Sequence, residues 1–234
     1  MRKFVGFLFL YFISAYSFGS YETYRPLVEL KAIKYGVPPY ALMALIRHES
    51  RGRPWTFNID GEGMFFNSKE KAVSTFTLIN QNPWMVKIKL KNNKYYRRFF
   101  NSGQSAADWS KKLANRSDTR LSIIVNPKKR IINPKRNTIL IRPLKVRNVD
   151  VGLGQINYIH HGQHLSDDIS FFQWLDPSTN IDYMAKHLKE LMDRHDNNVV
   201  VAMAYYHNRK KKFQDRYMAK VMPIFVKEKK LYGT

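Results

Sequence analysis

The most informative stretch of the sequence reads Pro38-Pro39-Tyr40-Ala41-Leu42-Met43-Ala44-Leu45-Ile46-Arg47-His48-Glu49-Ser50-Arg51-Gly52. It predicts a short helix with clear ends. Pro39 suits the first helical position, where a missing N–H costs nothing, and Gly52 suits the residue just past the last turn. The apolar residues that recur at helical spacing, and that we expect to form a buried stripe, are Leu42, Leu45 and Ile46.

Glu49 falls on the same stripe, two turns after Leu42. A carboxylate at the end of a core-facing stripe loses hydration, and this loss disfavours its charged form. Such a Glu is held protonated near neutral pH, as a general acid must be. The alternative is a helix-end Glu whose side chain turns out to solvent. Glu49 is therefore a candidate catalytic acid that needs support from the rest of the chain.

The N-terminus has the layout of a secretory signal peptide. Arg2 and Lys3 precede an apolar run from Phe4 to Ile13, and small residues follow as far as Ser20. The apolar run is short for a bilayer span. We therefore expect residues 1–19 to be a cleaved signal peptide, no transmembrane segment in the mature chain, and a periplasmic or secreted protein.

Composition narrows the classes of function. The chain has no cysteine, which excludes disulfides, a thiolate zinc site and a cysteine nucleophile. Its 234 residues, 44% of them hydrophobic, predict a single domain over residues 20–234. The 40 Lys and Arg against 18 Asp and Glu give a net charge of +22, so the surface should associate with polyanions.

Local patterns predict further elements on both sides of the central helix. A helix is expected over residues 27–36, in which Leu27, Leu30, Ile33 and Lys34 fall at helical spacing and which Gly36 ends. Alternating apolar residues around Asp60-Gly61 predict a β-hairpin over residues 55–66. Further helices are expected after the capping residues Ser68, Asp176 and Asn198, with a last helix that ends at Pro223. The fold class is mainly α (α+β).

Residues 80–147 differ from the rest and are expected to form a basic, partly β insertion. This segment holds 18 Lys and Arg against two Asp, a net charge of +16. Alternation after Trp84 predicts a strand with one wet, basic face, formed by Lys87, Lys89 and Lys91. Further strands are expected at 121–125 and 138–141, and a helix at 106–113. The aromatic residues Tyr95, Tyr96, Phe99 and Phe100 are read as a core edge in preference to a surface that stacks on bases.

Three motifs occur along the chain in a fixed order. They are Ala44-Leu45-Ile46-Arg47-His48-Glu49-Ser50, Val151-Gly152-Leu153-Gly154-Gln155-Ile156-Asn157 and Ala204-Tyr205-Tyr206-His207-Asn208. Together they resemble the lytic transglycosylases of the soluble, goose-lysozyme-like type. The resemblance covers about residues 25–70 and 148–212 and does not reach the basic segment. It implies a lysozyme-like helical domain with a small β-hairpin. The hairpin is similar, more loosely, to that of family members found with conjugation and secretion machinery.

The resemblance also implies an activity. Members of the family cleave the MurNAc–GlcNAc bond of peptidoglycan without water and leave a 1,6-anhydro end. Glu49 would protonate the leaving oxygen and then take the proton of the 6-hydroxyl, while the substrate's N-acetyl group replaces a second carboxylate. No metal and no other cofactor is implied. The residues implied to contact substrate are Ser50, Gln155, Asn157, Tyr206 and His207.

Two positions depart from the family's motifs. Gly154 stands where the family usually has Met, so we expect a packing contact in the cleft to be lost. His207 and Asn208 replace Asn-Ala, which should alter hydrogen bonding around Tyr206. These departures leave open a glycan-binding module that no longer cuts.

Other chemistries have weaker signals. His160, His161 and His164 with Asp167 and Asp168 have a metal-like composition, but three close histidines are often only surface polar residues, and no His-Glu-x-x-His motif exists. We therefore expect no metal site.

A hydrolytic lysozyme would need a second carboxylate, for which Asp60, Glu62 and Asp150 are candidates. Asp60 is better explained by its turn and Asp150 by capping of the glycine-spaced loop. The basic segment also suits a nucleic-acid binder, whose affinity would fall steeply with salt. An exported protein rarely meets DNA, so nucleic acid is not an expected partner. The expected partners are peptidoglycan glycan strands and an envelope complex of a conjugation or secretion system.

Overall fold

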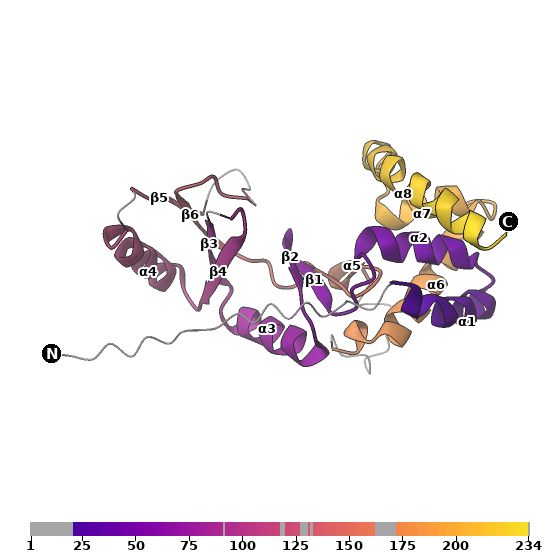
Figure 1. The fold of residues 1–234 in the computed structure, drawn as a ribbon, viewed down its shortest axis with the longest axis horizontal. Coiled ribbons are helices and arrows are strands. Elements are labelled where there is room, and N and C mark those ends of the chain that lie inside the picture. Colours follow the sequence, from indigo (N-terminus) through magenta and orange to yellow (C-terminus); the bar gives the residue numbers. More distant parts are fainter. Residues whose placement is uncertain are drawn as a thin grey trace.

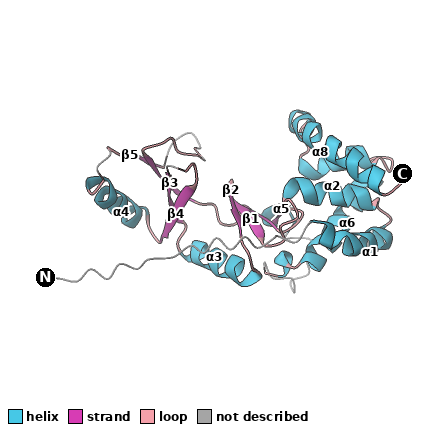
Figure 2. Ribbon diagram, viewed as in Figure 1, coloured by secondary structure: helices cyan, strands magenta, loops and turns pink. Residues whose placement is uncertain are grey.

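The computed structural model describes residues 21–90, 92–117, 120–126, 131, 133–161 and 172–233. Over these ranges the fold is a mixed α+β structure, with a group of helices at one end, one small sheet next to it and a second small sheet towards the other end (Figure 1, Figure 2). None of the helices described there has both the length and the apolar character needed to cross a membrane. The expected signal peptide, residues 1–19, lies outside the described residues.

The helical part is organised around the helix that the central stretch predicts. Its elements are η1 (Tyr21–Tyr24), α1 (Arg25–Tyr35), α2 (Pro39–Glu49), α6 (Pro177–Asp193), α7 (Val199–His207) and α8 (Lys211–Leu231). The predicted helix is confirmed as α2, and its residues Ala41–Ile46 are all buried. Because α2 packs against both α1 and α8, it forms the middle of the helical part (Figure 1).

The helix predicted over residues 27–36 is confirmed as α1, but its buried face is not the one that the apolar spacing suggests. Leu30 and Ile33 are 62% and 82% exposed, whereas Val28 and Ala32 are buried. The rotation of α1 is fixed by Asp182 on α6, which accepts hydrogen bonds from Lys31 Nζ at 2.8 Å, Lys34 Nζ at 2.9 Å and Tyr35 OH at 2.7 Å. These polar contacts leave Leu30 and Ile33 exposed, whereas Leu27 is partly buried and packs against the main core.

The first sheet contains the predicted hairpin. Its strands are β1 (Thr56–Ile59), β2 (Glu62–Phe65), β7 (Val149–Val151) and β8 (Ile156–Asn157), in the order β2-β1-β7-β8 with antiparallel neighbours. Asp60 and Gly61 form the turn with φ of 50° and 86°, as a two-residue hairpin turn requires. One face of the hairpin, with Phe57, Ile59 and Met64, belongs to the main core. The short helices α5 (Tyr158–His161) and η3 (Gln173–Leu175) follow this sheet.

The second sheet and α4 together form the part of the molecule that we call the basic lobe. It consists of β3 (Trp84–Lys89), β4 (Tyr95–Phe100), α4 (Gly103–Asn115), β5 (Ser122–Val125) and β6 (Thr138–Pro143), with the strand order β4-β3-β6-β5. A small core of Val86, Ala106, Ile139 and Ile141 lies between the sheet and α4. The helix α3 (Lys69–Gln81) leads into it from the hairpin (Figure 1). The predicted strands and helix are confirmed, and the aromatic segment at 95–100 proves to be an edge strand.

The prediction that β3 has a wet, basic face is wrong at Lys87. This side chain is 1% exposed, and its Nζ lies 2.7 Å from Glu62 Oε2. Arg142 of β6 bonds to the same carboxylate at 3.1 Å and to Asp60 Oδ2 at 2.6 Å. This buried ion-pair cluster joins the basic lobe to the back of the hairpin, so Lys87 faces protein instead of water. Lys91 lies outside the described residues.

The predicted end of the last helix at Pro223 is also wrong, since α8 continues to Leu231. Its buried stripe, with Val221 before the proline and Phe225 after it, runs through this position. Further along, the buried Glu228 pairs with Arg25 of α1 at 3.1 Å and with Arg47 of α2 at 2.5 Å. Tertiary contacts on both sides of Pro223 therefore outweigh the local cost of proline inside a helix.

Candidate active site

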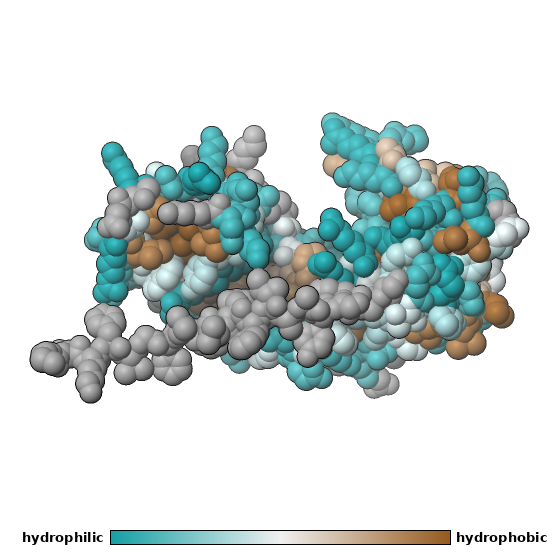
Figure 3. Space-filling model, viewed as in Figure 1, coloured by the Kyte–Doolittle hydropathy of each residue, from teal (hydrophilic) through white to brown (hydrophobic). Residues whose placement is uncertain are grey.

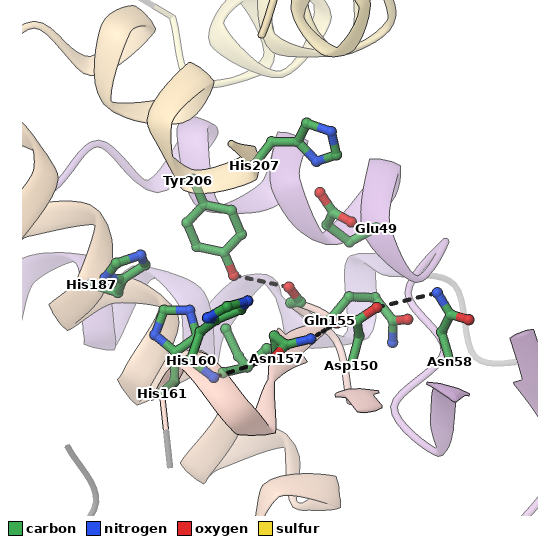
Figure 4. Close-up of a pocket in the computed structure, with 12 residues that line it drawn as sticks. Glu49, Asn58, Asp150, Gln155, Asn157, His160, His161, His187, Tyr206 and His207 are labelled. Atoms are coloured by element: carbon green, nitrogen blue, oxygen red, sulfur yellow. Dashed lines mark hydrogen bonds between the residues drawn. The ribbon is translucent and has the colours of Figure 1, made fainter. Parts of the chain in front are cut away.

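A cavity of about 460 Å³ lies where the end of α2 meets the first sheet and α7 (Figure 4). The residues that line it are Glu49, Asn58, Asp150, Gly154, Gln155, Ile156, Asn157, His160, His161, His187, Tyr206 and His207. They include residues from all three motifs identified in the sequence. The fold thus brings five of the six predicted site residues into one cavity.

Glu49 is the last residue of α2, where the helix leaves the core and reaches the cavity. Burial raises the pKa of its carboxyl from 4.5 to about 7, and the negative charge of Asp150 acts in the same direction. Tyr217 OH donates a hydrogen bond to Glu49 Oε1 at 2.7 Å, which acts in the opposite direction by stabilising the carboxylate. A carboxyl with this pKa is close to half protonated at neutral pH, as acid–base catalysis requires.

Sequence reasoning missed three residues of this site, Asn58 and His187, which line the cavity, and Tyr217. Tyr217 lies on α8 with its ring stacked on His207, at 4.2 Å between centroids and 3° between planes, and edge-on to His48 at 4.9 Å. The sequence placed it only on the apolar stripe of the last helix. Its hydroxyl could have indicated a polar partner nearby, because the O–H of a buried tyrosine normally forms a hydrogen bond.

The glycine-spaced loop before β8 is held in place by Asn180 of α6. Asn180 Nδ2 donates to Val151 O and to Trp174 O, both at 3.0 Å, and its Oδ1 accepts from Gly154 N at 2.8 Å. Gly152 has φ of 74°, and a Cβ there would lie 2.3 Å from Asn180 Nδ2. The backbone is thus closely pinned, and it presents Gln155, itself at φ of 47°, to the cavity. The Gln155 amide donates to Gly152 O at 2.9 Å.

Gly154 does not leave the gap expected from its departure from the family motif. A Cβ at this position would lie 2.4 Å from Met184 Cγ and 2.7 Å from the Tyr206 hydroxyl oxygen. Met184 of α6 therefore fills the space, and the expectation of a lost packing contact is wrong. Tyr206 OH donates to Gly154 O at 2.9 Å, so in this structure it supports the loop, while Tyr217 supplies the hydrogen bond to Glu49.

A polar row crosses the first sheet at the floor of the cavity (Figure 4). Asp150 accepts hydrogen bonds from Asn157 Nδ2 at 2.7 Å and from Asn58 Nδ2 at 3.2 Å. Burial raises the pKa of Asp150, and these two amide donors oppose the shift. Of the three candidates for a second carboxylate, Asp150 lines the cavity, whereas Asp60 and Glu62 belong to the ion-pair cluster behind the hairpin.

Ser50 is the predicted site residue that is not among those lining the cavity. Its side chain is buried, its hydroxyl donates to Ile46 O at 3.1 Å, and its Oγ accepts from Gly52 N at 3.2 Å. Ser50 therefore caps the C-terminal end of α2, next to Glu49. Ser50 was expected to contact the substrate directly, but its buried side chain is not among those that line the cavity.

Histidines line both ends of the cavity. His160, His161 and His187 lie at one end, where His161 Nδ1 is 2.8 Å from Tyr183 OH and the rings of His161 and His187 are 4.7 Å apart. At the other end, partial removal from water and the charge of Lys220 lower the pKa of His207.

The structure also bears on the metal site weighed from the sequence. Within the described ranges, no three His, Asp or Glu side chains are grouped so as to hold a metal ion. His164, Asp167 and Asp168 lie outside those ranges.

The chain was compared with protein families, with curated proteins and with solved structures. No family model, curated protein or solved structure matches it. Any assignment of function therefore depends on the motifs of the sequence and on the chemistry of this cavity.

Proposed function

We propose that this protein is a peptidoglycan lytic transglycosylase with a lysozyme-like domain, acting in the periplasm or outside the cell. The observation that carries the proposal is the state of Glu49, a cavity carboxyl whose pKa is raised to about 7 and which accepts a hydrogen bond from Tyr217. The motifs around it, which resemble those of the soluble transglycosylases, supply the substrate class. Amide side chains and tyrosine hydroxyls, which suit sugar hydroxyl and acetamido groups, surround this carboxyl.

The first step breaks the MurNAc–GlcNAc bond. Protonated Glu49 gives its proton to the glycosidic oxygen, and the bond between that oxygen and C1 of MurNAc breaks. The electron pair leaves with the oxygen, and the GlcNAc unit departs as an alcohol. The carbonyl oxygen of the substrate's own acetamido group stabilises the positive charge at C1, so one protein carboxyl is sufficient.

The second step closes the anhydro ring. Glu49 is now a carboxylate, which Tyr217 stabilises through its hydrogen bond, and it removes the proton of the MurNAc 6-hydroxyl. The 6-oxygen then attacks C1 and forms the 1,6-anhydro bond, which returns Glu49 to its protonated form. A pKa near 7 suits both steps, because the same group must give and take a proton.

The loop and α7 position the sugar in this scheme. Gln155 and Asn157 would hydrogen-bond to its polar groups, and Tyr206 would contact the acetamido group while it holds the loop at Gly154 O. His207 lies against Tyr217 and would orient that ring as well as line the subsite. The partners proposed are peptidoglycan glycan strands and, more loosely, an envelope complex of a conjugation or secretion system.

Asp150 supports a second candidate function, an ordinary hydrolytic lysozyme. Its carboxyl lines the same cavity, and its charge is felt by Glu49. In that case Asp150 would stabilise C1 or activate a water, and the products would carry reducing ends. The third candidate is a module that binds glycan without cleaving it.

Digestion of purified sacculi distinguishes these functions. We expect wild type to release muropeptides with 1,6-anhydro ends, identified by mass spectrometry, and Glu49→Gln to lose about 10²–10⁴-fold of the rate. The matched control is Glu70→Gln, an exposed change in the first turn of α3. Reducing ends would assign the hydrolytic mechanism, and glycan binding without release would assign the binding module. A Glu49→Gln variant that keeps most of its activity would contradict the role of Glu49.

A further inference from the structure

The sheet that forms the cavity floor continues beyond the cavity. In antiparallel pairing, residues directly opposite each other point to the same face of the sheet. Asn157 is opposite Asp150, Asp150 is opposite Asn58, and Asn58 is opposite Gly63 on the edge strand β2. Gly63 therefore lies in the same row as three cavity residues. It is two strand spacings, about 10 Å, from Asp150.

Gly63 is not required by the fold itself. Its φ lies outside the left-handed region, and an added Cβ would meet only the Phe65 ring, at 3.9 Å, an ordinary contact distance. A strand generally favours a β-branched residue over glycine. The missing side chain at Gly63 therefore leaves an open, exposed strip on this face that backbone geometry and packing do not explain.

Phe65 is the next residue of β2 on the same face. Its side chain is 52% exposed, and the guanidinium carbon of Arg53 lies 4.8 Å from the centre of its ring. A cation over one face of an aromatic ring favours a fixed orientation. One exposed aromatic residue is ordinary on a protein surface. The distinguishing feature of Phe65 is its place beside a row of side chains that begins in the cavity.

The surroundings give this face room for a long ligand. The space-filling view is hollowed between the basic lobe and the helical part, in the region where β1 and β2 lie in the ribbon view (Figure 1, Figure 3). A pyranose ring carries C–H groups on one face and hydroxyl groups at its edge. It can therefore stack on an exposed aromatic ring while its edge bonds to neighbouring amides.

We propose that the face of β2 at Gly63 and Phe65 is a distal subsite for the glycan chain whose bond is cleaved at Glu49. The polar row Asn157–Asp150–Asn58 leads the chain out of the cavity, the bare strip at Gly63 lets it pass, and Phe65 stacks on a sugar ring beyond. This inference rests on the proposed function. It adds that the protein prefers long glycan chains to short fragments.

The test measures kcat/KM for glycan strands of at least eight sugars and for tetrasaccharide fragments, together with melting temperature. Gly63→Val should raise the melting temperature, because valine suits a strand, yet lower kcat/KM for long strands about tenfold relative to fragments. Phe65→Ala should lower the same ratio about three- to tenfold, while Phe65→Tyr, which keeps the ring, should retain it. The control is Leu231→Ala, a removal of a similarly exposed apolar side chain (57%) at the far end of α8.

The outcomes separate this inference from the proposed function. If both Gly63→Val and Phe65→Ala keep the wild-type ratio of kcat/KM for long strands to kcat/KM for fragments, the distal subsite is overturned. Cleavage that still depends on Glu49 would in that case leave the proposed function intact. A fall in melting temperature with equal loss on long and short substrates would indicate a damaged sheet and would also overturn it. If wild type neither binds nor cleaves glycan, the inference and the proposed function fail together.

Discussion

Replacement of Glu49 by Gln should stabilise the protein at alkaline pH. Burial holds the pKa of this carboxyl at about 7 in the folded state, against an ordinary value of 4.5. Between these values the folded state binds more protons than the unfolded state, so stability falls as pH rises from 4.5 to 7. The difference of about 2.5 pKa units corresponds to roughly 3 kcal/mol of stability that wild type has lost at pH 8.

Gln has nearly the same shape and no charge, so Glu49→Gln avoids this loss. At pH 4 the wild-type carboxyl is neutral, and we expect the two proteins to unfold at similar urea concentrations. At pH 8 the variant should be more stable by up to about 3 kcal/mol, which for a chain of this size raises the melting temperature by roughly 6–12 °C. Urea unfolding at pH 4, 6 and 8 measures this trend directly.

Glu70 provides a control in which the pKa shift, and therefore the change in stability on replacement by Gln, has the opposite sign. Hydrogen bonds from the N-terminal end of α3 lower the pKa of this exposed carboxyl, so Glu70→Gln should lose stability, and only above the pKa of Glu70. If the free-energy difference between wild type and Glu49→Gln is the same at pH 4 and pH 8, Glu49 does not have a raised pKa. Its proposed role as an acid near neutral pH would then have no physical basis.

Three further predictions concern rates. Tyr217→Phe removes the donor that stabilises the carboxylate of Glu49, so the alkaline limb of the kcat/KM profile should move up by about one pH unit. Asp150→Asn removes a charge that raises the same pKa, so that limb should move to lower pH while anhydro products persist; loss of all product would favour the hydrolytic mechanism. Replacing the exposed Lys94, Lys111 and Lys112 by Gln should raise KM on sacculi at low salt and not at high salt, because surface charges are screened; an equal KM at all salt concentrations would exclude electrostatic steering.

Features with a local physical cause were predictable from the sequence. The start of α2 follows from Pro39, and the hairpin follows from Asp60-Gly61 between alternating apolar residues. The end of α2 lies earlier than Gly52 suggests, at Glu49 with Ser50 as the cap. Ser68 and Asp176 cap their helices as expected, each accepting hydrogen bonds from backbone N–H groups of the first turn. In all these cases the residues that interact are within a few positions of each other.

Features that depend on a distant partner were not predictable in this way. The rotation of α1 is set by Asp182, and the position of Lys87 is set by Glu62. Tyr217 reaches Glu49 across 168 positions of sequence. Periodicity assigned Lys87 and Tyr217 only to one face of a strand or helix. Which face is buried depends on the elements that pack against it, and periodicity does not identify these.

The ion-pair cluster changes the interpretation of the basic segment. Lys87 was expected on a wet, basic strand face, but it is buried beside Glu62 with Arg142. Glu62 pairs with Ile59 across the hairpin and points to the back of the sheet, whereas Asn58 and Gly63 point to the front. Removing one partner from such a buried cluster leaves an uncompensated charge and is strongly destabilising. The basic lobe therefore supports, from behind, the sheet whose front forms the cavity floor, and this structural role does not depend on any steering by its surface charges.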